Sequence, residues 1–273
     1  MTQAASASGL AMPADAPMGF TQVFADDFTQ AVPEGSFPAA VSGKWTAYPY
    51  GWHDTTGLGT YNPGIVSFHD SMMDIRLNVD SKGIVNVAAP VPLLSNKNAN
   101  NGQLYGLYEM RFKADLVQGF KTAWLLWPDS ESWPLDGEID FPEGWLDGTI
   151  GAYTHHQNGT SGSDQDAFGT QVSYADWHTA TLMWTPESVI YLLDGVQVGQ
   201  STSRIPSTPM HWVIQTETSE QPAPGATAHV YIDWLVAYSY TPVPAPAPVV
   251  VTPVPVPKPV PAPKPVPPHR HHR

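Results

Sequence analysis

Strand-length stretches in which apolar and polar side chains alternate recur along this chain, with turn residues between them. Residues 73–79, 106–112 and 179–184 each follow this pattern, which is typical of strands because successive side chains point to opposite faces of a sheet. Residues 189–198 hold two more such stretches around Asp194-Gly195, a strong hairpin signal. We find no stretch with the periodicity of an amphipathic helix. The sequence therefore predicts an all-β fold, a sandwich of two antiparallel sheets.

Composition divides the chain into three parts. Residues 1–18 are mostly Ala, Ser, Met and Pro without periodicity, and we expect them to be a flexible leader. Residues 19–240 carry the strand-like stretches and form the predicted folded domain. Residues 241–273 contain 13 prolines, which predicts an extended tail of about 100 Å at ~3.1 Å per residue. The tail is either a stiff spacer or a docking segment, and we expect both termini to be disordered.

Charge limits the classes of partner. The formal net charge is −13, and the first 240 residues hold 8 basic and 25 acidic residues, or 8 − 25 = −17. Such a surface repels phosphate backbones and anionic membranes, so we expect no nucleic-acid partner and favour a neutral ligand. The chain has no cysteine, which excludes thiolate chemistry. It has no apolar run long enough for a membrane span, so we expect no membrane insertion.

The sequence Gly-Glu-Ile-Asp-Phe-Pro-Glu-Gly places three carboxylates in an otherwise apolar stretch. As a strand, it puts Glu138 and Asp140 on one face, whereas Glu143 falls on the opposite parity. One extra residue would correct this parity, and a proline, which cannot donate a ladder hydrogen bond, favours a bulge. We therefore expect a β-bulge at Phe141-Pro142 that turns all three acids into one space.

Two glutamates in this arrangement suit glycoside hydrolysis. Their Cα atoms would lie about 13 Å apart, and side chains leaning inward can reach the ~5–5.5 Å carboxyl separation of a retaining enzyme, although the wider inverting separation is also compatible. One glutamate would attack the anomeric carbon while the other donates a proton and then activates water. Crowding predicts at least one raised pKa. A bulged edge strand with solvated acids and a calcium-binding loop remain alternatives.

Residues 138–143 resemble the active-site signature of glycoside hydrolase family 16, in its bulged form. Other stretches resemble that family in the expected order over about residues 20–240, although residues 212–218 depart from its usual pattern. The matching stretches are Phe24–Phe28, Tyr105–Lys113, Thr122–Pro128, Trp177–Ser188 with Asp194-Gly195, and Ile232–Trp234.

The resemblance implies a curved, concanavalin-like jelly-roll sandwich with a sugar-binding cleft on its concave sheet. It implies a retaining endo-hydrolase that cleaves a β-linked polysaccharide, with β-1,3-glucan or β-1,3-1,4-glucan as the favoured substrate. By position Glu138 would be the nucleophile, Glu143 the acid/base and Asp140 their assistant. The resemblance implies no catalytic cofactor. It does imply a structural calcium on the convex side, bound partly by Asp233. The alternative for Asp233 is solvent exposure or a hydrogen bond to a loop.

Five further residues are predicted to contact substrate. Trp124 and Trp133 flank the acids and match cleft tryptophans of the family, where rings stack on sugar faces; burial in the core is the alternative. His155 and its neighbour point to opposite faces of a strand, so one of them can face the cleft but the pair cannot easily chelate one ion. Gln215 and Glu217 share parity, so both are expected in the cleft.

Other functions remain open at this point. The alternatives are a non-catalytic carbohydrate-binding module, a transglycosylase or galactan hydrolase of the same family, and a surface protein whose proline-rich tail is the working part. We expect a monomer that is extracellular or at the cell surface, although the N-terminus shows no signal peptide.

Overall fold

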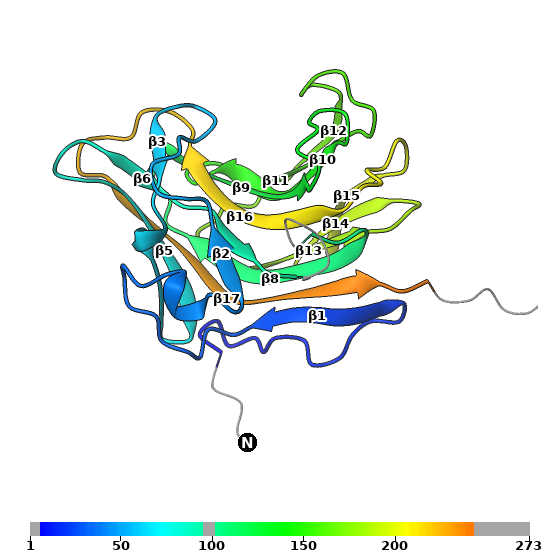
Figure 1. Cartoon of the computed structure of the whole chain (residues 1–273), viewed down its shortest axis with the longest axis horizontal. Helices are drawn as coiled ribbons and strands as arrows, with labels where there is room; N and C mark the ends of the chain where they lie inside the picture. The colour runs from blue at the N-terminus through cyan, green and yellow to red at the C-terminus, as the bar shows by residue number, and fades with distance from the viewer. Residues whose placement is uncertain (1–5, 95–101, 243–273) are drawn as a thin grey trace, which may run out of the picture. The chain divides into compact units, whose positions relative to one another are not determined.

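The computed structural model describes residues 6–94 and 102–242. Within these ranges the regular structure consists of β-strands and two short 3-10 turns, η1 (Ala39–Val41) and η2 (Pro63–Ile65), with no α-helix. Two large sheets lie one over the other (Figure 1). The predicted all-β sandwich is therefore confirmed.

The larger sheet has ten strands; β1, β8, β13 and β17 lie below the smaller sheet in Figure 1, while β3 and β6 rise beside it at the left. Its main path runs β15-β14-β13-β8-β17-β5-β6-β3, while β1 also pairs with β17 and β4 with β5. Its strands are β1 (Phe20–Asp26), β3 (Gly59–Tyr61), β4 (Val66–His69), β5 (Met72–Val79), β6 (Val85–Val87), β8 (Gly106–Ala114), β13 (His178–Trp184), β14 (Val189–Leu193), β15 (Val196–Ser201) and β17 (Thr227–Tyr240).

The smaller sheet has five strands in the order β12-β11-β10-β9-β16 and carries the acidic segment. Its strands are β9 (Phe120–Pro128), β10 (Glu138–Trp145), β11 (Gly151–His155), β12 (Gln165–Gly169) and β16 (Met210–Thr218). A separate two-stranded sheet pairs β2 (Trp45–Ala47) with β7 (Pro90–Pro92).

One pairing differs from the purely antiparallel prediction. Strands β3 and β6 run parallel at the end of the ten-stranded path. A parallel pair needs a crossover of a dozen or more residues, and the chain between Tyr61 and Val85, which includes β4 and β5, supplies that connection.

Aromatic side chains fill the space between the two large sheets. Phe112 of β8 contacts Trp124 of β9 with ring centroids 5.1 Å apart, and Phe141 of β10 contacts Tyr191 of β14 at 5.4 Å. All four are buried. Burying each such side chain contributes about 1.5–3 kcal/mol, so these contacts fix one face of the small sheet against the core.

The prediction that Trp124 contacts substrate is wrong. It is fully buried in the hydrophobic core. Side chains of β9 alternate, so Trp124 shares the core-facing parity, whereas Lys121 and Trp127 lie on the opposite face.

The prediction of a flexible leader is wrong for Ser6–Leu10. The backbone N–H groups of Ala7 and Ser8 donate to the carboxylate of Asp233 at 2.9 and 3.1 Å, and the indole of Trp234 donates to the carbonyl of Leu10 at 2.8 Å. These contacts dock the segment on β17.

Residues 1–5 and the proline-rich tail beyond residue 242 lie outside the described residues. No helix in the described part of the chain has the length and apolar character of a membrane span.

Candidate active site

The predicted bulge in β10 is present. Asp140 lies opposite Tyr153 and Glu143 lies opposite Gly151, so three steps along β10 match two steps along β11. The pairing with β9 shows the same shift between Asp140 and Glu143. The extra residue brings Glu143 back to the parity of Glu138 and Asp140, while Phe141 packs into the core. The bulge at Phe141-Pro142 is thus confirmed as the local reason that the acids share one face.

Glu138, Asp140 and His155 form a tight cluster on this face. His155 lies directly opposite Glu138 on β11, and its Nε2 is 3.4 Å from Oδ2 of Asp140 and 3.8 Å from Oε2 of Glu138. The neighbouring residue His156 instead pairs with Asp164 at 3.0 Å. The structure therefore directs the two adjacent histidines to different partners and brings His155 to the acids, while its predicted contact with substrate stays a prediction.

Burial governs the protonation of the three acids. Their side chains are 14 % (Glu138), 3 % (Asp140) and 24 % (Glu143) exposed. Burial, followed by the charge of Asp140, raises the pKa of Glu138 well above its usual range. Burial, followed by the charge of Glu143, does the same to the pKa of Asp140. Burial also raises the pKa of Glu143, against the opposing charge of Lys121. Such a cluster retains protons at pH values where isolated carboxyls are ionised.

Sequence reasoning missed Lys121. Its Nζ lies 3.4 Å from Oε1 of Glu143 and 3.0 Å from Oε2 of Glu217, in register opposite Glu217 on β16. A signal was available, because Lys121 is the one charged residue in the strand-like stretch Phe120–Pro128, shortly before the three acids. The structure thus adds one cation to the acid cluster.

Glu217 and Gln215 both face this side of the sheet, as their parity predicts, but at different depths. Glu217 is 1 % exposed and accepts hydrogen bonds from the Thr55 N–H and the Tyr61 hydroxyl. It lies beneath the surface of the cleft, so the prediction that it contacts substrate directly is wrong. Gln215 lines a cavity of about 250 Å³ next to Glu138.

The aromatic wall of the site comes from Trp133 and residues near it. Trp133 is 40 % exposed, stacks on Trp127 with centroids 6.2 Å apart, and meets the His155 ring edge-on at 6.1 Å. The Trp127 indole donates to Glu131 at 2.8 Å, which fixes the stack. Trp133 therefore lies beside the acids with an exposed ring, as a sugar-stacking residue requires.

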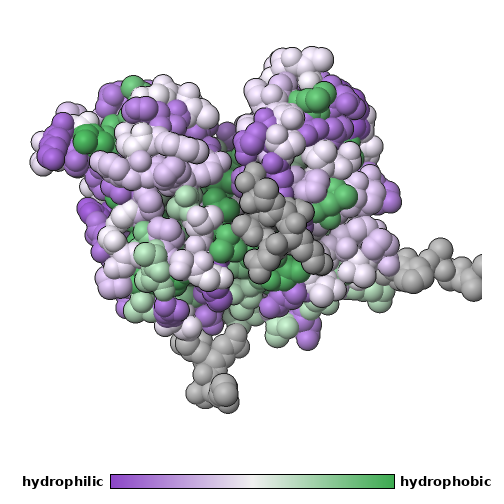
Figure 2. Space-filling view, in the orientation of Figure 1, coloured by the Kyte–Doolittle hydropathy of each residue, from purple (hydrophilic) through white to green (hydrophobic). Residues whose placement is uncertain are grey.

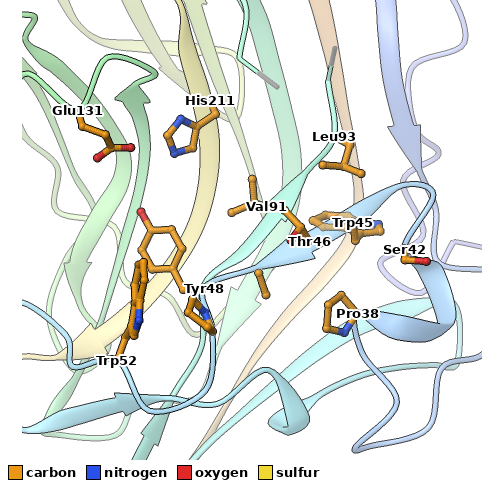
Figure 3. Close-up of a pocket in the computed structure, with 12 residues that line it drawn as sticks. Pro38, Ser42, Trp45, Thr46, Tyr48, Trp52, Val91, Leu93, Glu131 and His211 are labelled. Carbon is orange, nitrogen blue, oxygen red and sulfur yellow. The ribbon is translucent and has the colours of Figure 1, made fainter. Parts of the chain in front are cut away.

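Three hollows adjoin the acid cluster or its neighbours. Figure 2 shows the molecule hollowed along its upper edge between two raised lobes. The 250 Å³ cavity holds Glu138, and a cavity of about 350 Å³ holds Glu143 together with the exposed Trp145. A third cavity, of about 680 Å³, adjoins the first because Tyr48 and Trp52 line both (Figure 3). Space for an extended ligand therefore exists on both sides of the acids.

Asp233, which the resemblance implied as a calcium ligand, is hydrogen-bonded to the N-terminal segment. Its carboxylate accepts the N–H groups of Ala7 and Ser8 and the hydroxyls of Ser6 and Ser8. A cation at these oxygens would have to displace the two N–H donors, whereas the hydroxyl oxygens of Ser6 and Ser8 could serve as further ligands, so calcium at Asp233 stays a prediction. Within residues 6–94 and 102–242, the one group of three side chains with closely spaced ligand atoms is Glu138, Asp140 and His155, within 4.8 Å of one another. Pairing of His155 with the two acids accounts for that proximity.

Comparison with known proteins agrees with this geometry. Residues 62–235 match the sequence profile of glycosyl hydrolases family 16. A β-glucanase of Acetivibrio thermocellus is 32 % identical over 107 residues, which is 38 % of this chain and 31 % of that protein. The Crh-like protein 3 of Botryotinia fuckeliana is 30 % identical over 101 residues, 37 % of this chain and 21 % of that protein. The chain thus spans a third or less of the length of these relatives.

Solved structures share the fold. The laminarinase of Rhodothermus marinus superposes with a TM-score of 0.67 at 19 % identity, covering 82 % of this chain and 98 % of that one. The laminarinase catalytic domain of Thermotoga maritima gives a TM-score of 0.66 at 18 % identity, covering 82 % and 99 %. The family profile covers more than half of the sequence and includes the acidic strand, so the chain belongs to glycosyl hydrolases family 16.

Proposed function

We propose that this chain is a retaining endo-β-glucanase that cleaves β-1,3-glucan of the laminarin type or mixed β-1,3-1,4-glucan. The observation that carries the proposal is the bulge in β10, which gathers Glu138, Asp140 and Glu143 on one face beside an exposed tryptophan. The β-glucanase name of one relative and the laminarinase names of the structural neighbours support the choice of substrate.

The chemistry follows from the two outer glutamates. Glu143 gives its proton to the glycosidic oxygen as the bond to the anomeric carbon breaks, and the Glu138 carboxylate attacks that carbon to form a glycosyl ester. Glu143, now ionised, takes a proton from water, and the resulting hydroxide equivalent displaces Glu138. The raised pKa of Glu143 keeps a proton available for the first step.

Asp140 supports the nucleophile. It is almost fully buried and next to Glu138, and the pKa values of both groups are raised, so the pair holds a proton between them. A proton held on Asp140 leaves Glu138 ionised for attack and hydrogen-bonds to it. His155 lies near both carboxylates, with its Nε2 3.4 Å from Asp140 and 3.8 Å from Glu138, so an imidazolium there would favour their ionised forms.

Release of reducing ends from laminarin, mixed-linkage glucan and agarose tests the proposal. We expect release from the two glucans, and loss of more than about 1,000-fold in kcat for Glu138→Gln with an unchanged melting temperature. Glu109→Gln in β8 of the other sheet is the matched control and should keep full activity. No release from any of the three polysaccharides by the unaltered protein would refute the hydrolase assignment, and binding without turnover would favour a carbohydrate-binding module.

Three accompanying proposals concern the whole protein. We place it outside the cell or at the cell surface, as a monomer, because its proposed substrate is a polysaccharide and its body is acidic. The proline-rich tail is proposed as a spacer. Deletion of residues 243–273 should then leave the rate on soluble glucan unchanged, and a lower rate would favour a docking segment.

A further inference from the structure

Lys121 lies between two carboxylates that differ in exposure and in role. Its Nζ donates to Oε1 of Glu143 at 3.4 Å and pairs with Oε2 of Glu217 at 3.0 Å. The Lys121 side chain is 19 % exposed, that of Glu143 24 % and that of Glu217 1 %. A lysine with two carboxylate partners in a partly dry cleft is held much more firmly than one at the surface.

Glu217 provides the anchor for this lysine. Its Oε1 accepts from the Thr55 N–H at 3.1 Å and from the Tyr61 hydroxyl at 3.3 Å, which leaves Oε2 for Lys121. Strands β16 and β9 pair at Glu217 and Lys121, so the backbone register itself sets the position of both. Glu217 is too deeply buried to meet a polysaccharide, and its charge acts on Lys121.

We propose, building on the function proposed above, that Lys121 is a positioning residue that fixes the carboxyl of Glu143, and that Glu217 holds Lys121 for this task. Lys121 donates to Oε1, so Oε2 is the oxygen that carries the proton to the leaving group. When that proton moves to the glycosidic oxygen, the carboxylate formed on Glu143 faces the Lys121 ammonium. The same contact orients Glu143 as it receives a proton from water in the second step.

Several charged groups face Glu143, and their effects have different signs. Lys121 on β9 and His155 on β11 favour its ionised form, whereas Glu217 on β16 opposes that form. Glu138 and Asp140 on the same strand interact with Glu143 through their charges, and the charge of Glu143 also raises the pKa values of Tyr153 and Tyr174. Removal of Lys121 therefore raises the pKa of Glu143, whereas removal of the Glu217 charge lowers it.

The test compares pH profiles of kcat/KM on laminarin for Lys121→Met, Glu217→Gln and the double variant. The fall in kcat/KM on the basic side of the profile reports the pKa of the acid/base group. We expect this basic limb to lie about one pH unit higher in Lys121→Met and about half a unit lower in Glu217→Gln. The double variant should lie between wild type and Lys121→Met, and it leaves no unpaired buried charge if Lys121→Met folds poorly. Lys113→Met, which removes a lysine from β8, is the matched control and should keep the wild-type limb.

A split between kcat and KM separates positioning from direct sugar binding. Loss of positioning should lower kcat by about 10–100-fold while KM changes by less than about threefold. A basic limb that stays at the wild-type pH in both single variants, or moves in the same direction in both, would overturn the proposal. So would a loss expressed mainly in KM.

A second readout does not need activity. Titration of the Glu143 carboxyl by carbon NMR should show the same opposite shifts in the two single variants. If the unaltered protein cleaves no glucan, the proposed function fails, yet this titration still decides whether Lys121 and Glu217 control Glu143. If the glucanase is active and the carboxyl titration is identical in all variants, only the role of Lys121 falls.

Discussion

Two aspartates on different sheets, Asp140 and Asp233, are each only 2 % exposed, yet their surroundings differ completely. Asp233 accepts four hydrogen bonds from Ser6, Ala7 and Ser8. Oδ2 of Asp140 has no hydrogen-bond partner among the described residues and lies near His155 and Glu138. A satisfied buried carboxylate stabilises a fold, whereas an unsatisfied one among other acids is costly and is typical of functional sites.

The same contrast separates the two faces of the molecule. On the five-stranded sheet, three acids share one space and burial raises the pKa of each. On β17 of the ten-stranded sheet, N–H and hydroxyl groups of a short N-terminal segment donate hydrogen bonds to one acid. We infer that the first site is organised for chemistry at some expense of stability, and that the second contributes stability alone.

Among the substitutions that test the contrast between the two aspartates, Asp140→Asn is expected to have the largest effect. We expect kcat to fall by about 100-fold, because the amide cannot share a proton with Glu138. The free energy of unfolding should not decrease, since the change removes a carboxylate that is poorly satisfied. Steady-state kinetics and urea unfolding measure the two effects. A variant that unfolds more easily while keeping its kcat would show that Asp140 stabilises the fold and does not take part in catalysis.

Asp233→Asn should give the opposite result. We expect a loss of about 2 kcal/mol in the free energy of unfolding, because an amide NH₂ would face the N–H donors of Ala7 and Ser8. Activity measured well below the melting temperature should be unchanged. Urea unfolding with and without calcium provides the measurement and a check on the ion: rescue of the variant or stabilisation of wild type by calcium would show that Asp233 does bind a cation.

Replacement of the two serines sharpens the same point with a smaller effect. Ser6→Ala with Ser8→Ala removes the hydroxyl donors and keeps the N–H donors, so we expect a loss of about 1 kcal/mol. The control is Thr29→Ala, which removes an exposed hydroxyl. Thr56 is left unchanged because its hydroxyl bonds to the buried Asp54. Equal stability of the serine variant and the control would mean that the segment merely rests on β17.

The pH dependence should follow the reactive site alone. In the proposed mechanism Glu138 must be ionised to attack, and because its folded-state pKa is raised above 4.5, we expect activity to be lost as pH falls through that raised value. The acid limb of kcat/KM should therefore lie above 4.5. In Asp140→Asn the acid limb should move down by about one unit, since the fraction of molecules in which Asp140 is ionised no longer raises the pKa of Glu138. Asp233→Asn should leave the acid limb of kcat/KM unchanged. A shift of this limb in Asp233→Asn would show that the two sites are energetically coupled.

Much of the reactive face could be predicted from local pattern. Parity and Pro142 were enough for the bulge, because both act within six residues. Trp124 was misassigned for a physical reason: its ring type suits a sugar cleft, but alternation along β9 directs it to the core. Parity was the stronger constraint, since a strand cannot turn one side chain to the other face without a bulge.

The rest depends on contacts between distant parts of the chain. Ser8 and Asp233 are 225 residues apart, and the leader has no periodic pattern that would indicate a partner. The pairing of Lys121 with Glu217 depends on the register between β9 and β16, which local alternation does not fix. The calcium expected at Asp233 came from resemblance, and the donors that surround its carboxylate could be seen only in the folded chain.

The most direct test of the central claim follows the stereochemistry of cleavage. Proton NMR of laminarin hydrolysis should show the β-anomer of the new reducing end first, and a fluorinated, slow-turnover substrate should leave a sugar covalently attached to the peptide containing Glu138. First appearance of the α-anomer, or a covalent sugar on any other residue, would contradict the account.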